Sequence, residues 1–280
     1  MSAGGTQTNK LPENQFPRSP DLPSQSPKYW VKEKDRYLRQ ILIRDIEAAT
    51  KRPLFVYFAQ LDQEINHTDA DDISEILLGI TSRSADFLIQ TPGGNVDATE
   101  KIIAILRHRL DDFRVIVPSW AKSAGTVISL SATKILFGVN SELGPIDPQW
   151  RTQQGQFPCE LIAKDAAFPQ HVRDFAQMQV TRMRNLATAI LKRGMMSTKS
   201  DAEIGDILKK ISSSDGYNSH GAVIDYSEAM QLGLAAEFLP PADEMWQRIW
   251  LLYCMYDYDS KARNLGKIFE GSRFSIGRPK

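Results

Sequence analysis

Short apolar runs alternate with amphipathic segments along the first half of the chain. The apolar runs are rich in aromatic and β-branched residues and predict buried strands at 53–58, 87–90, 113–117 and 135–137. The segments around them predict helices at 37–49, 69–81, 96–109 and 124–132. Strands that alternate with helices in this way indicate an α/β fold, with βα units on a mainly parallel sheet.

The second half of the chain is more helical. Residues 165–193 predict a long helical stretch, broken near Pro169, which we expect to project from the sheet. Further helices are expected at 197–211 and at 226–232, where Gly233 provides a C-terminal stop.

The two ends of the chain differ from the middle. Residues 1–30 are rich in Ser, Pro, Gln and Asn, and they carry too little apolar surface to offset the entropy of ordering. Residues 244–258 contain two Trp and three Tyr, which indicates a helix packed on the core or a contact with another molecule. The last residues, 261–280, contain glycines and cations and are expected to be loosely ordered.

Composition excludes several classes of protein. The 280 residues are 42% apolar and carry 34 basic and 34 acidic side chains, a balance that argues against nucleic acid as a partner. Cys159 and Cys254 are too few for a disulfide framework or a zinc quartet, so no metal is expected and the cytoplasm is the expected compartment. No secretory signal and no integral membrane segment are predicted.

A glycine-rich turn follows the second predicted strand. In Thr91-Pro-Gly-Gly-Asn-Val96, Gly93 and Gly94 permit positive φ and close backbone approach, although such a turn is also common in a purely structural role. The segment lacks the G-x-G-x-x-G and G-x-x-x-x-G-K-[ST] patterns. No nucleotide or other cofactor is therefore predicted.

Ser123 follows the third predicted strand in the run Lys122-Ser-Ala-Gly-Thr126. The run departs from the G-x-S-x-G nucleophile elbow because Ala121 stands two residues before the serine, and Ser123 alone could equally be a helix cap. The two turns occur in order on successive βα units. Together the two turns can supply what acyl transfer to serine requires, which is a nucleophilic hydroxyl and backbone N–H donors for the oxyanion.

Four ordered motifs carry a family resemblance. Segments 90–96, 121–126, 143–149 and 227–234 together resemble the ClpP/crotonase superfamily, and are most similar to the serine dehydrogenase proteinase (SDH) family, signal peptide peptidase A and the membrane-associated serine peptidases of the NfeD operon. The likeness covers about residues 50–240. It implies stacked ββα units, an acyl-enzyme mechanism and assembly into homo-oligomers.

The resemblance also implies a domain organisation and roles for four residues. Together with the composition of the two ends, it divides the chain into a disordered N-terminal arm (1–30), a ClpP-like serine peptidase domain (31–240) and an aromatic helical segment with a flexible tail (241–280). Ser123 matches the nucleophile. Gly94 and Ala124 match the residues whose amides form the oxyanion hole, and Gly93 allows the turn.

The general base is where the sequence departs from ClpP, because no histidine occurs between Ser123 and His171. The peptidases that this chain resembles use a lysine from further along, and Lys164 lies in a similar region. A buried lysine can be neutral near pH 7 and accept the serine proton, so a Ser123/Lys164 dyad is the preferred hypothesis.

His220 is the competing base. It lies in a polar loop just before the 227–234 motif, where it could fold back on the site, although a surface histidine is the commoner situation. Asp147 is better suited to fixing its own turn or orienting a base than to acting alone. Lys122 adjoins the serine and is expected to point elsewhere.

The sequence therefore favours an ATP-independent serine peptidase that hydrolyses peptide bonds in a peptide or protein substrate through an acyl-serine intermediate. One alternative is a catalytically inactive ClpP-like oligomeric scaffold that binds a partner. Another is an acyl-thioester enzyme of the crotonase type, because the same backbone oxyanion hole stabilises enolates.

Overall fold

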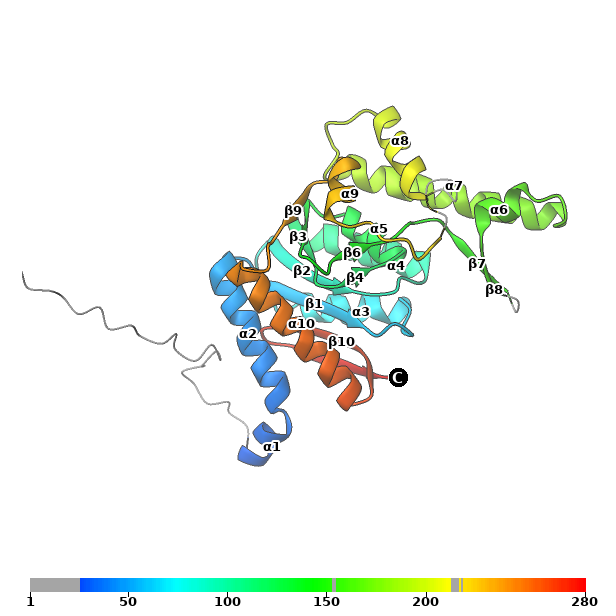
Figure 1. Cartoon of the computed structure of the whole chain (residues 1–280). Coiled ribbons are helices and arrows are strands. Elements are labelled where there is room, and N and C mark those ends of the chain that lie inside the picture. The colour runs from blue at the N-terminus through cyan, green and yellow to red at the C-terminus, as the bar shows by residue number, and fades with distance from the viewer. Residues whose placement is uncertain (1–25, 153–154, 213–216, 218) are drawn as a thin grey trace, which may run out of the picture.

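A seven-stranded sheet forms the centre of the protein in a computed structural model that describes residues 26–152, 155–212, 217 and 219–280 (Figure 1). The strand order is β11-β10-β1-β2-β3-β5-β9. Neighbours from β1 to β9 are parallel, whereas β10 is antiparallel to β1 and β11 is antiparallel to β10. These strands are β1 (Leu54–Ala59), β2 (Ser84–Gln90), β3 (Asp112–Val117), β5 (Lys134–Phe137), β9 (Ala236–Phe238), β10 (Leu265–Gly271) and β11 (Ser275–Pro279).

Two short pairs of strands lie outside this sheet. β4 (Trp120–Ala121) pairs in parallel with β6 (Glu142–Leu143). β7 (Gln149–Thr152) and β8 (Gly155–Pro158) form an antiparallel hairpin. The α/β class and the mainly parallel sheet that the sequence predicts are confirmed.

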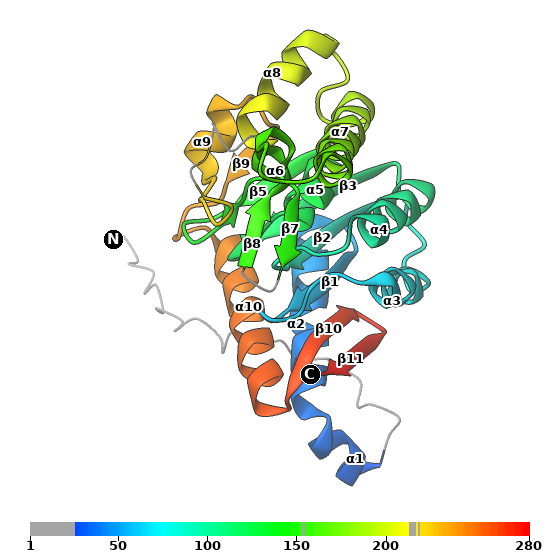
Figure 2. The same cartoon turned by 90° about the vertical axis from the view of Figure 1, so that its right-hand side faces the viewer.

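Helices cover both faces of the sheet (Figure 2). One face carries α2 (Lys34–Thr50) and α10 (Glu244–Ala262), and their buried side chains form one core with Leu54, Val56 and Phe58 of β1. The remaining helices, apart from the short α1 (Pro27–Lys32), lie on the opposite side. They are α3 (His67–Leu77), α4 (Val96–Arg109), α5 (Ala124–Leu130), α6 (Cys159–Lys164), α7 (Gln170–Arg193), α8 (Asp201–Ser212) and α9 (Tyr226–Gln231).

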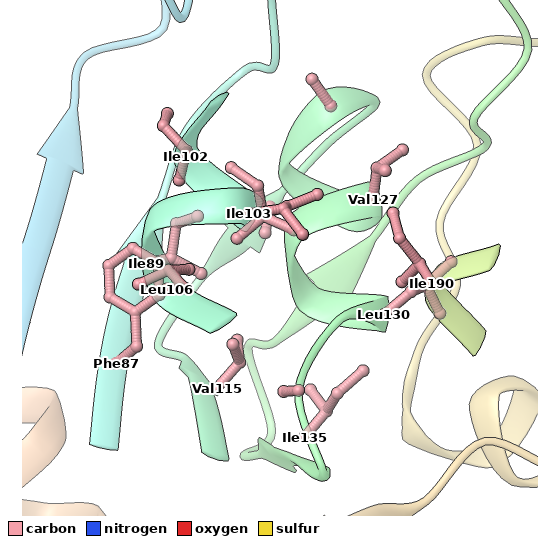
Figure 3. Close-up of a cluster of buried hydrophobic side chains, with 14 of the residues drawn as sticks. Phe87, Ile89, Ile102, Ile103, Leu106, Val115, Val127, Leu130, Ile135 and Ile190 are labelled. Atoms are coloured by element: carbon pink, nitrogen blue, oxygen red, sulfur yellow. The ribbon is translucent and has the colours of Figure 1, made fainter. Parts of the chain in front are cut away.

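The larger core lies between the sheet and α3, α4, α5 and α7. Phe87 and Ile89 of β2 meet Ile102 and Leu106 of α4, and α5 is buried along its whole length (Figure 3). Such close packing holds the strand ends in fixed positions, because a densely packed core has little free space in which the backbone can shift. The loops that leave β2 and β3 therefore start from a rigid base.

The helical stretch predicted at 165–193 corresponds to α7, which begins after Pro169. The short helix α6, just before it, was not predicted. Together with the β7–β8 hairpin the two helices form an arm that projects from the sheet (Figure 1). Cys159, Ile162, Ala176 and Val180 make a small separate core within this arm.

The expectation of a flexible tail at the C-terminus is wrong. β10 pairs with the buried strand β1 through five residue pairs, from Phe55 opposite Gly271 to Ala59 opposite Lys267, and β11 completes that edge of the sheet. The aromatic segment likewise packs on the core as α10, so the residues after 240 belong to the main fold. Of the expected N-terminal arm, residues 1–25 lie outside the described residues, and residues 27–32 form α1.

Replacing Phe269 by Ala tests the place of β10 in the core. Phe269 is fully buried and stacks on Tyr57 with ring centroids 4.8 Å apart. The change is expected to lower the free energy of unfolding by about 3–5 kcal/mol, measured by chemical denaturation. The control is Tyr258→Ala, since Tyr258 is 71% exposed and its loss is expected to cost below about 0.5 kcal/mol. Equal stabilities of the two variants would contradict this fold.

Candidate active site

The two turns that the sequence singles out lie in contact. The Thr91 amide donates to Trp120 O at 3.3 Å, and the Lys122 amide donates to Thr91 O at 3.0 Å. A Cβ built on Gly93 would lie 2.7 Å from both Lys122 O and Ser123 Cβ, so only glycine fits there. Residues 91–95, here called the glycine bend, are therefore packed directly against Ser123.

Ser123 has an unusual backbone conformation, with φ 53° and ψ −115°. Such a conformation costs energy for a residue with a side chain and is typical of a nucleophile elbow, where a sharp turn between strand and helix exposes the hydroxyl. The side chain makes no capping hydrogen bond to α5, and the residue is partly exposed. The hydroxyl is therefore not occupied as a helix cap.

Two backbone amides beside Ser123 are available as donors. Ile65 binds the glycine bend on both sides of Gly94, because its amide donates to Gly93 O at 2.7 Å and its carbonyl accepts from the Asn95 amide at 2.9 Å. Ile65 and Gly94 thus form a parallel β-bridge, in which the amide of Gly94 points away from Ile65. Within the described residues, neither the Gly94 nor the Ala124 amide donates a hydrogen bond. Free amides in this position are the usual components of an oxyanion hole.

No sequence signal points to the role of Ile65, because nothing distinguishes one isolated apolar residue in a loop. A Cβ at Gly94, where φ is 148°, would come within 2.4 Å of the Ile65 nitrogen. The close approach of these two segments therefore depends on glycine at position 94.

His220 forms a pair with Asp147. The distance between His220 Nδ1 and Asp147 Oδ1 is 2.7 Å, and the carboxylate is buried while the imidazole is 28% exposed. Gln149 Nε2 donates to the other carboxylate oxygen. A buried carboxylate on Nδ1 fixes the tautomer that leaves Nε2 free to accept a proton. Nε2 makes no hydrogen bond to any residue in the described part of the chain.

The segment that carries His220 is attached to the residues around Ser123. Ile224 and Leu143 exchange backbone hydrogen bonds of 2.9 and 3.0 Å. Lys122 Nζ donates to Ala222 O at 3.1 Å and to Leu143 O at 3.2 Å, so the lysine beside the serine points away from it and ties these loops together.

The turn that carries Asp147 is attached to α5 in the same way. Thr126 Oγ1 donates to Gly144 O at 2.8 Å and accepts from the Gly144 amide at 3.1 Å. Because Thr126 lies in the first turn of the helix that begins after Ser123, this contact holds the turn before Asp147 close to the serine.

Lys164 occupies a different part of the molecule. It ends α6 in the projecting arm, its side chain is 60% exposed, and Nζ lies 2.9 Å from Glu160 Oε1 (Figure 1). Within one chain, α6 lies away from α5, which follows Ser123. His67, His108 and His171 are exposed on α3, α4 and α7. Cys159 is buried in the small core of the projecting arm, and burial together with the Asp147 charge raises the pKa of its thiol to about 11.

A family model for ClpP-like SDH-type serine proteinases matches residues 64–264 of the chain. The chain belongs to this family. The match covers the glycine bend, Ser123, Asp147 and His220, and continues through α10.

Two relatives from Methanocaldococcus jannaschii are similar in sequence. The uncharacterized protein MJ0137 is 33% identical over 186 residues, which cover 62% of this chain and 62% of the relative. The uncharacterized protein MJ1495 is 28% identical over 177 residues, which cover 59% of this chain and 57% of the relative. The chain thus spans about three fifths of the length of the relatives that it matches.

Two solved structures are also similar. A point mutant of ClpP1 from Listeria monocytogenes has a TM-score of 0.45 and 17% identity, over 71% of this chain and 98% of that one. A mutant of 1510-N, a membrane-bound stomatin-specific protease, has a TM-score of 0.47 and 13% identity, over 66% of this chain and 79% of that one.

No helix among the described residues has the length and apolar character to cross a membrane. No group of three or more His, Cys, Asp or Glu side chains in those residues is arranged to hold a metal ion.

Proposed function

We propose that this member of the SDH-type serine proteinase family is an ATP-independent peptidase in which Ser123 is the nucleophile and His220 is the general base. The observation that supports this assignment is the Asp147–His220 pair. The two loops that carry it are bonded, at Ala222 and Gly144, to Lys122 and Thr126, which flank the strained serine. His220 replaces Lys164 as the preferred base because the lysine is exposed and ion-paired on α6.

The proposed chemistry follows from these positions. Ser123 Oγ attacks the carbonyl carbon of the scissile peptide bond while His220 Nε2 takes the hydroxyl proton, and the Asp147 carboxylate stabilises the imidazolium that forms. The amides of Gly94 and Ala124 donate to the oxygen that becomes negative. The imidazolium then gives its proton to the leaving amine. Water, deprotonated by the same imidazole, releases the acyl group from the serine.

The substrate class and the assembly are also proposals. Peptides or flexible protein segments are the substrates that we propose, because the family consists of serine proteinases and Ser123 is partly exposed to solvent. A homo-oligomer is supported by apolar side chains exposed on the projecting arm, namely Phe157, Leu161, Phe175 and Met178. We retain the cytoplasm as the proposed location.

Hydrolysis of an unfolded protein tests the proposed function. The purified protein, incubated without nucleotide with reduced and alkylated casein, is expected to release new amino termini, measured with an amine-reactive fluorophore. The same preparation given an acyl-coenzyme A thioester is expected to release no thiol. Thiol release without new amino termini would favour the acyl-thioester chemistry, and the absence of both would favour a scaffold.

A further inference from the structure

A buried ion pair lies behind the glycine bend. Lys267 Nζ of β10 donates to Asp69 Oδ1 and Oδ2 of α3 at 2.8 and 2.7 Å, with side-chain exposures of only 5% and 0%. The Tyr57 hydroxyl of β1 donates to Asp69 Oδ2 at 2.9 Å. Buried charges are tolerated when they are paired and hydrogen-bonded, and this pair meets both conditions.

The ion pair holds the peptide groups on both sides of Ile65. Lys267 Nζ also donates to Glu64 O at 2.7 Å, and Asp69 Oδ2 accepts from the Asn66 amide at 3.0 Å. Ile65 lies between these two anchored groups, and its own backbone binds the glycine bend on both sides of the Gly94 amide. The direction of that amide therefore depends on the ion pair through a single intervening residue.

Tyr57 provides a second connection to the glycine bend. The Thr91 side chain of the glycine bend interacts with the Tyr57 phenol. Thr91 Oγ1 in turn accepts from the Gly93 amide at 3.2 Å. Burial, reinforced by the Asp69 charge, raises the pKa of Tyr57 well above its usual value. The phenol therefore remains an O–H donor to Asp69 at any pH at which the site would work.

We propose that Lys267, Asp69 and Tyr57 are positioning residues of the oxyanion hole, which hold the Gly94 amide in the direction that the negative oxygen requires. This inference rests on the proposed function. Strand β10 then contributes to the oxyanion hole, although it lies far along the sequence from both turns of the site.

The chain contains a matched control on the opposite face of the sheet. There the Tyr256 hydroxyl donates to Glu270 Oε2 at 2.7 Å, and Arg39 Nε donates to the same oxygen at 2.7 Å. This group resembles the first one, because a buried tyrosine hydroxyl donates to a buried carboxylate that is also ion-paired. Among the described residues, none of its hydrogen bonds reaches the glycine bend. Tyr57→Phe and Tyr256→Phe therefore each remove one equivalent hydroxyl.

Kinetics of the two variants test the inference. In Tyr57→Phe, kcat for peptide hydrolysis is expected to fall roughly 10- to 100-fold with KM unchanged, because a displaced oxyanion donor affects the transition state more than the bound substrate. Tyr256→Phe is expected to keep the wild-type kcat. Equal kcat values in the two variants would overturn the inference.

Hydrogen exchange separates this inference from the proposed function, because it does not depend on activity. In Tyr57→Phe, the amides of residues 93–95 are expected to exchange faster than in Tyr256→Phe and in the wild type, measured by mass spectrometry on peptides that cover the glycine bend. Identical exchange in all three proteins would overturn the positioning role. An inactive wild-type protein that shows the expected exchange would refute the proposed function alone.

Discussion

Ser123→Ala is expected to reduce kcat for peptide hydrolysis by roughly 10⁴- to 10⁶-fold, which leaves only background cleavage. The hydroxyl is the atom that forms the acyl bond in the proposed mechanism, and no neighbouring group replaces it. The variant is expected to remain folded, because the side chain makes no capping hydrogen bond to α5. Initial rates with casein and a thermal unfolding curve of the same preparation measure both quantities.

Ser119 provides the control for this experiment. It is a partly exposed serine in the turn between β3 and β4, close to Ser123 in the sequence, and Ser119→Ala is expected to keep the wild-type rate. A fully active Ser123→Ala protein would remove the nucleophile and with it the proposed mechanism.

His220→Ala is expected to reduce kcat by a similar factor, roughly 10⁴- to 10⁶-fold. The serine hydroxyl is a weak nucleophile at neutral pH unless a neighbouring base accepts its proton. Asp147→Asn keeps the size of the side chain and is expected to cost about 10⁴-fold, because the amide no longer fixes the imidazole in the productive tautomer. Steady-state rates with one peptide substrate compare these variants.

Lys164→Ala distinguishes the two bases that the sequence left open. Its ammonium is exposed and ion-paired to Glu160 at 2.9 Å, so the variant is expected to keep wild-type activity. Loss of activity in Lys164→Ala, together with normal activity in His220→Ala, would reverse the assignment. It would also require a lysine from a neighbouring subunit, because α6 lies away from α5 within one chain (Figure 1).

The middle of the fold could be read from the sequence because its signals are local. The strand at 113–117 and the helix at 96–109 follow from the periodicity of nearby apolar residues, and they correspond to β3 and α4. The order of the two turns on successive βα units also follows from the sequence. Because parallel strands end at the same edge of a sheet, the glycine bend and Ser123 were expected to meet, and they are in contact.

The C-terminal strand could not be read in this way. In β10 the apolar pair Ile268 and Phe269 stands between Lys267 and Glu270, and charged residues at both ends of a short run indicate a surface segment. Both charges are buried against partners about two hundred positions away in the sequence, Asp69 and Arg39. Ion pairs between residues so far apart in the sequence leave no local pattern of charges from which they could be predicted.

The base of the candidate site was ambiguous for a similar reason. His220 and Asp147 are 73 positions apart, and each lies in a loop without regular periodicity. Their pairing depends on backbone bonds between Leu143 and Ile224, which tertiary structure alone reveals.

Covalent labelling with a fluorophosphonate, followed by peptide mapping, tests most directly whether Ser123 is an activated nucleophile. We predict one phosphonylated residue, Ser123, in the folded wild-type protein, and loss of the label in His220→Ala and after unfolding. A label on any other residue, or none at any pH at which the protein stays folded, would contradict this prediction.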